Sequence, residues 1–197
     1  MTPRLRAAGL RSALAGPFDL SLASGACLAV MGPSGAGKSL LLRMLADLDE
    51  HSGEAWLDGA PRSGFAPPEW RRRVGYLAAE SGWWLERVGE HFATAPSRLL
   101  GELGLPADIL GRAVALCSTG ERQRLALART LAGEPAALLL DEPTGALDAA
   151  SVAAVESVLQ ARLRLGVAMV VVTHDPGQAA RLGSCQARIA GGRMLPG

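Results

Sequence analysis

The chain has 197 residues, 49% of them hydrophobic, and its basic and acidic residues nearly balance at a formal net charge of +1. This length suits one domain with a sizeable core, and the balance excludes the strong basic excess typical of nucleic-acid-binding proteins. No apolar run approaches the ~20 residues of a membrane-spanning helix. Residues 2–11 lack the pattern of a secretory signal peptide. The three cysteines are scattered without metal-ligand spacing, which indicates reduced thiols in a cytosolic protein.

The first third of the chain predicts short strands and one helix. Alternating apolar residues from Phe18 to Leu22 are typical of a half-buried strand. The apolar run from Cys27 to Met31 predicts a buried strand, and the apolar density of residues 40–48 predicts a core helix. Residues 53–59 predict a strand that ends at an Asp-Gly turn, and the Gly, Pro and Ser residues over 60–68 predict a loop.

The rest of the chain predicts alternating strands and helices with one interruption. Between Gly82 and Leu116, short helical pieces at 88–95 and 99–110 are broken by Gly and Pro, which predicts a small inserted helical lobe. The other elements predicted are a strand at 74–77, a helix at 120–131, a strand at 137–140, a helix at 151–165 and a strand at 167–172. This order favours an α/β fold with a mainly parallel sheet.

The stretch GPSGAGKS lies between a predicted buried strand and a predicted helix. Its glycines permit positive φ and bring backbone N–H groups close to an anion, and the helix N-terminus adds positive potential at the same place. Lys38, the one lysine in a chain whose other basic residues are arginines, supplies a compact charge to the β- and γ-phosphates. The alternative is a chance glycine-rich turn. The nucleotide-binding residues predicted are Gly32, Pro33, Ser34, Gly35, Ala36, Gly37, Lys38, Ser39 and Leu40.

Two predicted strands end in polar groups. The apolar run Leu138 to Leu140 stops at Asp141 and Glu142, and a second apolar strand ends just before His174. An aspartate there suits a magnesium ion that keeps its water shell, and a glutamate one residue on suits polarisation of an attacking water. Taken alone, the acidic pair also fits a solvated turn, and a lone histidine also fits a surface or structural role.

The chain resembles the ATP-binding cassette (ABC) ATPases, the nucleotide-binding domains of ABC transporters. The resemblance covers nearly the whole chain and rests on ordered motifs, which are GPSGAGKS at 32–39, CSTGERQRLALAR at 117–129, LLLDEPTGALD at 138–148 and VVTHD at 171–175. A phosphate loop alone is shared by many kinases and GTPases. The combination in this order is specific to the ABC class.

This resemblance implies an α/β fold with a P-loop NTPase core of mainly parallel sheet, an N-terminal antiparallel β part and a small inserted helical lobe. We therefore expect a single ABC ATPase domain over residues 1–197. Its nucleotide-binding core is expected in 1–81 and 118–197, with the helical insert in 82–117.

The resemblance also implies roles for single residues in ATP hydrolysis. Glu142 corresponds to the catalytic glutamate, His174 to the switch histidine that contacts the γ-phosphate, and Lys38 to the Walker A lysine. Ser39 and Asp141 correspond to the ligands of Mg²⁺. The cofactors implied are thus ATP and Mg²⁺.

A second group of residues is implied to act across a dimer. Ser118, Thr119, Gly120 and Glu121 align with the signature loop, which in this family reaches the ATP held by the other subunit, and Asp148 aligns with the D-loop. A helix N-terminus near Gly120 would bind the γ-phosphate by the same anion logic as the first loop.

The function implied is that of the ATP-hydrolysing subunit of a membrane ABC transporter. Its partners would be a second copy or a paired ABC subunit and an integral membrane permease subunit, with no nucleic acid. Its location would be cytoplasmic, peripheral on the inner face of the cell membrane. Two alternatives remain open: a soluble ABC ATPase acting on nucleic acid or ribosomes, and a degenerate nucleotide-binding regulatory module.

Four departures from the family pattern accompany these matches. Thr119 stands at a glycine position of the signature, Ala79 stands where the Q-loop glutamine falls, with Glu80 beside it, and Leu40 replaces a hydroxyl residue. No aromatic residue precedes Phe18, so Leu10 or a neighbour is expected to offer adenine only apolar contact. Each lost hydrogen bond is worth about 1 kcal/mol, and together they predict weakened ATP affinity.

Two further stretches have competing interpretations. Arg71 to Arg73 suit a solvated face better than a lipid or partner contact. Trp83 and Trp84 are adjacent and cannot both point into one core, so partner contact and ordinary packing are equally favoured.

Overall fold

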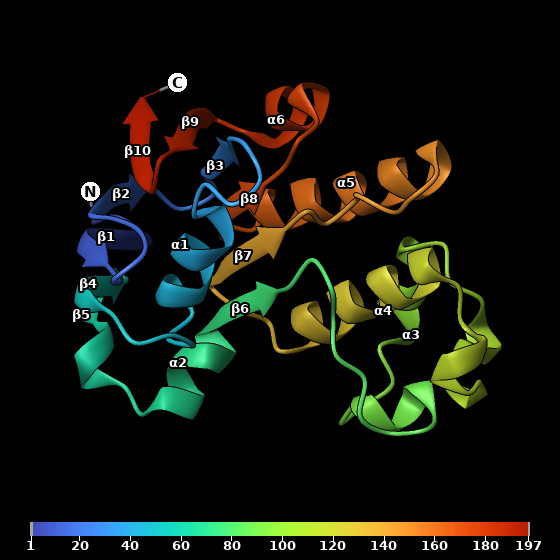
Figure 1. Cartoon of the computed structure of the whole chain (residues 1–197). Coiled ribbons are helices and arrows are strands. Elements are labelled where there is room, and N and C mark those ends of the chain that lie inside the picture. Colours follow the sequence, from blue (N-terminus) through green and yellow to red (C-terminus); the bar gives the residue numbers. More distant parts are fainter. Residues whose placement is uncertain (1, 197) are drawn as a thin grey trace.

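The protein, described over residues 2–196 by a computed structural model, is built on two sheets (Figure 1). The smaller sheet is antiparallel in the order β2-β1-β4-β5, with β1 at Leu5–Arg11, β2 at Phe18–Leu22, β4 at Ser52–Leu57 and β5 at Ala60–Pro61. The larger has the order β10-β9-β3-β8-β7-β6, with β3 at Cys27–Met31, β6 at Val74–Leu77, β7 at Ala137–Asp141, β8 at Ala168–Val172, β9 at Cys185–Ala190 and β10 at Arg193–Pro196. Its pairs are parallel except β9 with β10. The predicted fold class is confirmed.

Helices cover both faces of the larger sheet (Figure 1). They are α1 at Lys38–Leu45, α2 at Pro67–Arg73, α3 at Ser97–Glu102, α4 at Thr119–Ala132, α5 at Ala149–Arg164 and α6 at Pro176–Leu182. Because side chains alternate along a strand, β7 contributes Leu139 to one core, shared with α1, α2 and the smaller sheet. It contributes Leu138 and Leu140 to the other, shared with α4, α5 and residues of the insert. The central strands are thus buried on both faces, as their continuous apolar runs predict.

Residues 82–117 contain one short α-helix, α3, and three 3₁₀ turns at Val88–His91, Ala107–Gly111 and Val114–Leu116. The helical piece expected over 99–110 is split, because Gly104 adopts a positive φ of 65, which glycine tolerates and a helix does not allow. Pro106 then precedes the second turn. Val88, Leu99 and Ile109 are buried in the same core as α4. The division into a core and an insert at these boundaries stays a prediction.

The structure differs from the predicted elements around the first helix. Helix α1 ends at Leu45 rather than near Leu48, since Asp47 turns to φ 57. The stretch predicted as a loop over 60–68 contains β5 and the start of α2, because Pro67 occupies the first turn of a helix, where its missing N–H costs nothing. Trp70 of α2 is fully buried, and its indole N–H donates to the Leu45 carbonyl at 2.9 Å. The sequence patterns made no prediction for β1, β9, β10 and α6.

Across residues 2–196, no helix combines the length and the apolar character needed to cross a membrane.

Gly53 gives a test of the smaller sheet. It has φ 88, and a Cβ there would lie 2.3 Å from the Gly9 carbonyl oxygen, where the β1–β4 register shifts. We expect Gly53→Ala to lower the free energy of unfolding by about 2 kcal/mol or more, because both the positive φ and the backbone overlap oppose it. In Gly101→Ala, on α3 with open space around the added Cβ, stability should rise by about 0.5–1 kcal/mol. Urea unfolding of both variants checks this, and equal stabilities would contradict it.

Candidate nucleotide site

The loop from Gly32 to Gly37 connects β3 to α1 and has the backbone shape of a phosphate cradle. Gly32, Gly35 and Gly37 have φ values of 148, 73 and 102. At Gly32 a Cβ would lie only 2.1 Å from the Ile189 carbonyl oxygen, so only glycine fits at this position. Gly37 is the N-cap of α1 in the left-handed conformation, and the amide groups of the first helical turn point toward the loop.

Lys38 is held over this loop. Its ammonium donates to the Gly32 carbonyl at 2.8 Å and to the Pro33 carbonyl at 2.9 Å, and the residue is only 7% exposed. Ser39 is exposed beside it, whereas Leu40 is half-buried and packs against the core. Of the predicted nucleotide-binding residues, the structure therefore places Pro33, Ser34 and Gly35 exposed on the loop and turns the side chain of Ala36 inward.

Asp141 ends β7 next to Ser39. Burial raises the pKa of the Asp141 carboxyl, a hydrogen bond from the Ser39 hydroxyl opposes this shift, and the charge of Glu142 adds to it. The structure thus brings together the two residues predicted as metal ligands, one from the end of a strand and one from the first turn of α1. Two neighbouring oxygen donors of this kind fit Mg²⁺, which prefers oxygen ligands and keeps several of its waters.

Glu142 and His174 meet beyond the ends of two neighbouring strands. His174 Nε2 lies 3.0 Å from Glu142 Oε1, and both side chains are partly exposed, at 48% and 39%. Glu142 has φ 49, a left-handed conformation that is unusual for a residue other than glycine. Its N–H donates to the Val172 carbonyl at 2.9 Å, which continues the β7–β8 pairing one residue past the strand.

The signature segment begins α4 with a capping box. The Ser118 hydroxyl accepts from the Glu121 N–H at 3.2 Å, and Glu121 Oε2 accepts from the Ser118 N–H at 2.7 Å. The pKa of Glu121 is lowered, mainly by the hydrogen bond from the Ser118 backbone. The Arg112 guanidinium lowers it further, whereas burial raises it. Ser118 and Thr119 are exposed at the helix N-terminus. Both capping side chains therefore have partners within the chain.

A cleft of about 540 Å³ opens between this segment and Glu142. Its lining joins Thr119, Arg122 and Gln123 of α4 to Ala79 and Glu80 after β6 and to the turn after β7. Gly120 packs on that turn, where an added Cβ would lie 3.3 Å from the Leu147 side chain. The segment that stands in place of the Q-loop glutamine thus borders the same cleft as Glu142.

Gln123 is a residue of this site for which the sequence patterns suggested no role. Its Nε2 donates to the Glu142 carbonyl at 2.7 Å, and its Oε1 accepts from the Ala146 N–H at 3.3 Å. The side chain therefore ties α4 to both ends of the turn that carries Glu142. The position of Gln123 within CSTGERQRLALAR could have indicated a role in the site, but the motif does not predict the direction of its side chain.

Asp148 caps α5. Its carboxylate accepts from the Ser151 N–H at 2.9 Å and from the Ser151 hydroxyl at 3.1 Å. These bonds lower the pKa of Asp148. This residue of the D-loop match therefore contributes to folding whatever it does across a dimer.

Leu10 does not lie where an adenine ring could reach it, because the residue is fully buried in the core with Phe18. The expectation that names Leu10 itself is wrong. The two-residue period of Leu5 and Ala7 would turn Leu10 outward, but the register shifts between Ala7 and Leu10, where Gly9 has φ 62, and this turns its side chain inward. The neighbouring Leu14 is 80% exposed. It lies next to Ala15, whose Cβ is 3.0 Å from the position of a Cβ built on Gly37. The apolar contact expected from a neighbour of Leu10 is therefore available beside the phosphate loop.

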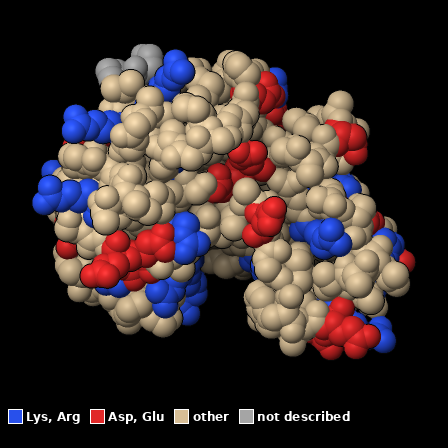
Figure 2. Space-filling view, viewed as in Figure 1, with Lys and Arg blue, Asp and Glu red and all other residues tan. Residues whose placement is uncertain are grey.

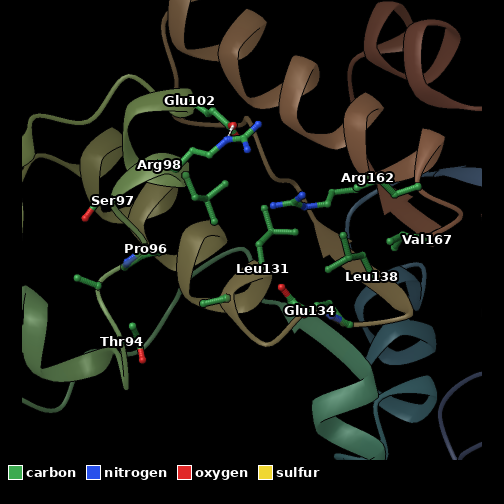
Figure 3. A pocket seen from close by; sticks show the side chains of 15 residues that line it. Thr94, Pro96, Ser97, Arg98, Glu102, Leu131, Glu134, Leu138, Arg162 and Val167 are labelled. Carbon is green, nitrogen blue, oxygen red and sulfur yellow. Dashed lines mark hydrogen bonds and ion pairs between the residues drawn. The ribbon is translucent and has the colours of Figure 1, made fainter.

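A second cavity, larger than the cleft that Glu142 lines, lies away from these motifs. It measures about 840 Å³ and is lined by α3, the end of α4 and the end of α5. Figure 3 shows Arg98 joined to Glu102 and Arg162 extending toward Leu131. Leu138 and Val167, at the amino ends of β7 and β8, form part of its wall, at the opposite ends of these strands from Asp141 and Val172.

Charged side chains of both signs are spread over the face of the molecule seen in Figure 2, with uncharged surface between them. This mixture matches the near balance of basic and acidic residues in the chain. On this face the surface does not present the continuous basic stripe that would follow a nucleic-acid backbone.

The fold and the site define a P-loop nucleotide-binding protein. The model of the ABC transporter family matches residues 16–145 of the chain. The chain therefore belongs to the ABC transporter family, and the resemblance inferred from its motifs is confirmed.

Curated relatives and a solved structure agree with this assignment. The chain is 37% identical over 209 residues to the hemin import ATP-binding protein HmuV of Myxococcus xanthus, covering 91% of this chain and 76% of that one. It is 36% identical over 182 residues to the sulfate/thiosulfate import ATP-binding protein CysA of Mesostigma viride, and there it covers 82% of this chain but only 51% of the relative. A dimeric ATP-binding cassette in a post-hydrolysis state with ADP and phosphate superimposes with a TM-score of 0.83 at 22% identity, over 98% of each chain. That likeness shows the fold.

The capping box predicts a pH effect on stability. The folded-state pKa of Glu121 is lowered, so its contribution is fully present above the carboxyl's ordinary pKa of ~4.3 and is lost as pH falls through the lower folded-state pKa. Glu121→Gln should therefore unfold more easily than the native chain near pH 7, and this difference should shrink at acid pH. Denaturant unfolding at pH 7 and at ~3.5 checks it, with the exposed Glu80→Gln as control. A difference that grows at acid pH would contradict the assignment.

Proposed function

We propose that this chain binds and hydrolyses ATP as the energy-supplying subunit of a membrane transporter. The observation that carries the proposal is the meeting of Glu142 and His174 at 3.0 Å, next to Asp141 and Ser39. Lys38 and the phosphate cradle come after strand β3, which pairs with β8. The names of relatives, which are ATP-binding proteins of import systems, support coupling to transport.

In the proposed reaction, each side chain has one task. The loop amides and Lys38 bind the phosphates and spread their negative charge. Glu142 accepts a proton from, or orients, the water that attacks the γ-phosphate, and His174 holds both the Glu142 carboxylate and the γ-phosphate. Because Glu142 and His174 already lie within hydrogen-bond distance, the carboxylate is directed before the nucleotide arrives.

Ser39 and Asp141 are the residues that would hold Mg²⁺. A bound Mg²⁺ neutralises charge on the β- and γ-phosphate oxygens. The raised pKa of Asp141 comes first from burial, and a cation beside the carboxylate favours its ionised form.

The complete site is proposed to form between two ABC subunits, either two copies of this chain or this chain and a paired subunit. Ser118, Thr119 and Gly120 lie at the start of α4, exposed or half-buried and close to the cleft that Glu142 lines. The N-terminus of this 14-residue helix would face the γ-phosphate of the ATP held by the second subunit. Asp148 would lie on the adjoining turn. Because Thr119 stands where the family has glycine, its side chain leaves the backbone less room to approach the phosphate.

A membrane permease is the proposed second partner, and an exposed aromatic patch supports it. The Arg129 guanidinium lies 4.7 Å from the Trp83 ring and 4.9 Å from the Trp84 ring. The His91 ring lies 4.8 Å from each. Trp84 is nevertheless 68% exposed and Leu85 42%. An exposed tryptophan that contacts an arginine has the composition of a binding hot spot. In this assembly the chain would lie in the cytoplasm, on the inner face of the membrane.

Glu142→Gln tests the proposed hydrolysis. Loss of the general base should lower kcat by at least about 100-fold, leave ATP binding intact and stabilise an ATP-bound dimer. Phosphate release, nucleotide binding and analytical ultracentrifugation measure these three effects. Glu134→Gln is the matched control, because Glu134 also has positive φ and precedes the same strand. An ATP-bound variant that stays monomeric at high protein concentration would contradict the proposed mechanism.

Trp84→Ser tests the proposed permease contact. When the tagged chain is purified from gently solubilised native membranes, we expect a multi-span membrane protein to accompany it and to be lost by about tenfold in the variant. Leu165→Ser is the control, since Leu165 is likewise exposed, at 73%, but lies at the end of α5. Recovery without any membrane protein, or with nucleic acid, would instead favour a soluble ABC ATPase. A membrane complex without Lys38-dependent hydrolysis would favour a regulatory module.

A further inference from the structure

Behind the Glu142–His174 pair lies a set of polar side chains to which the motifs assign no role. Glu156 of α5 is 6% exposed and Gln178 of α6 is fully buried. Arg181 of α6 closes the set from the surface, with a side chain 47% exposed. Burial of a carboxylate is costly unless it is paired and hydrogen-bonded, so these residues must be considered together.

The hydrogen bonds of this set form a continuous network. Arg181 donates from Nε to Glu156 Oε2 at 2.6 Å and from Nη2 to Glu156 Oε1 at 2.8 Å, a bidentate pair. Gln178 Nε2 donates to the Thr144 hydroxyl at 2.7 Å and to Glu156 Oε1 at 3.4 Å. Arg181 Nη2 also lies 3.3 Å from Asp175 Oδ2. Both protons of the Gln178 amide are therefore in use, and its orientation is fixed.

The two ends of this hydrogen-bond network lie next in sequence to Glu142 and His174. Thr144 lies two residues after Glu142, and Asp175 directly follows His174. Strand β7 ends at Asp141 and β8 at Val172. The backbone bonds of the sheet extend one residue further, to the Glu142 and Thr173 N–H groups, and the parts of the turns beyond them depend on other contacts. Gln123 holds the first turn from the α4 side. The α5–α6 set holds it from the other side and joins it to the turn of His174.

A purely structural role would not require these polar groups. Well-packed apolar residues in place of a buried ion pair are often as stable or more stable, whereas hydrogen bonds of fixed direction place a hydroxyl and a carboxylate at set positions. The Gln178 Oε1 atom is buried without a hydrogen-bond partner among the described residues, a cost that apolar packing would avoid.

We propose that Glu156, Gln178 and Arg181 are positioning residues for ATP hydrolysis, which keep the turn of Glu142 and the turn of His174 in a fixed relation. The inference rests on the proposed roles of Glu142 and His174. The hydrogen bonds of the three positioning residues go to these turns and to one another, so they act on turnover and not on the binding of ATP.

Arg181→Met tests the proposal through kinetics, because it retains the alkyl stem and removes the bidentate pair. We expect kcat for ATP hydrolysis to fall about tenfold while the KM for ATP stays within about twofold. Arg181→Lys should recover part of the loss, since an ammonium keeps the charge but not the fork. Arg164→Met, at an exposed arginine that ends α5, should match the native chain. A loss expressed only in KM would overturn the proposal.

Hydrogen–deuterium exchange tests it without reference to activity. Gly145 N–H and Leu147 N–H donate to carbonyls within the turn, and Ala146 N–H donates to Gln123. In Arg181→Met and in Glu156→Gln we expect these amides to exchange about fivefold faster, with the amides of α4 unchanged. Faster exchange throughout the chain would mean a merely structural role and would overturn the proposal, as would unchanged exchange in a variant with lowered kcat. If Arg181→Met does not fold, Arg181→Lys carries the same comparison.

The two proposals fail in different ways. Native-like hydrolysis by Glu142→Gln would reject the proposed role of Glu142 even if the exchange result holds. Slow hydrolysis by Glu142→Gln with normal exchange in both positioning variants would reject the positioning role alone.

Discussion

The parallel pairing of β8 with both β3 and β7 is the constraint on which the site depends. Val172 lies opposite Val30 on one side and Asp141 on the other, so three strands end at one edge. The phosphate loop, the acidic pair and the turn of His174 each come at the end of one of these strands. Residues far apart in sequence thus come together, because the carboxyl ends of neighbouring parallel strands lie at the same edge of the sheet.

Strand pairing alone does not complete the candidate site, because Glu142 and His174 come after the last residues of β7 and β8. Helix side chains complete it. Gln123 of α4 bonds the Glu142 carbonyl, and Gln178 of α6 bonds the Thr144 hydroxyl. The turn of Glu142 is therefore held from both sides by glutamines, of which Gln123 both donates and accepts and Gln178 donates.

The sequence predicted the parts of the fold that depend on short-range pattern. The continuous apolar runs of β3, β7 and β8 and the glycine pattern of the phosphate loop are local signals, and the structure agrees with them. Helix α2 was missed because proline suggests a loop and only the structure shows Pro67 in a first turn. The directions of the Gln123 and Gln178 side chains depend on neighbours 19 and 34 residues away. Leu10 faces inward because the strand register shifts between Ala7 and Leu10. Such facts require the tertiary structure.

Several residues that resemble family functional positions also serve folding, and this changes what their presence means. Ser118 and Asp148 each cap a helix, so a chain that had lost its activity would still gain from keeping them. Lys38 is different, because its buried ammonium donates to loop carbonyls, and neutral carbonyls offset the desolvation of a charge less well than a paired carboxylate would. Trp84 is different as well, since 68% of it stays exposed although its ring contacts Arg129 and His91, so these contacts account for only part of a large apolar side chain. Where a residue costs stability and caps nothing, selection on function is the remaining physical reason for it. The strongest support for nucleotide binding and for a partner surface is therefore at these two residues, and not at the best-matched letters of the motifs.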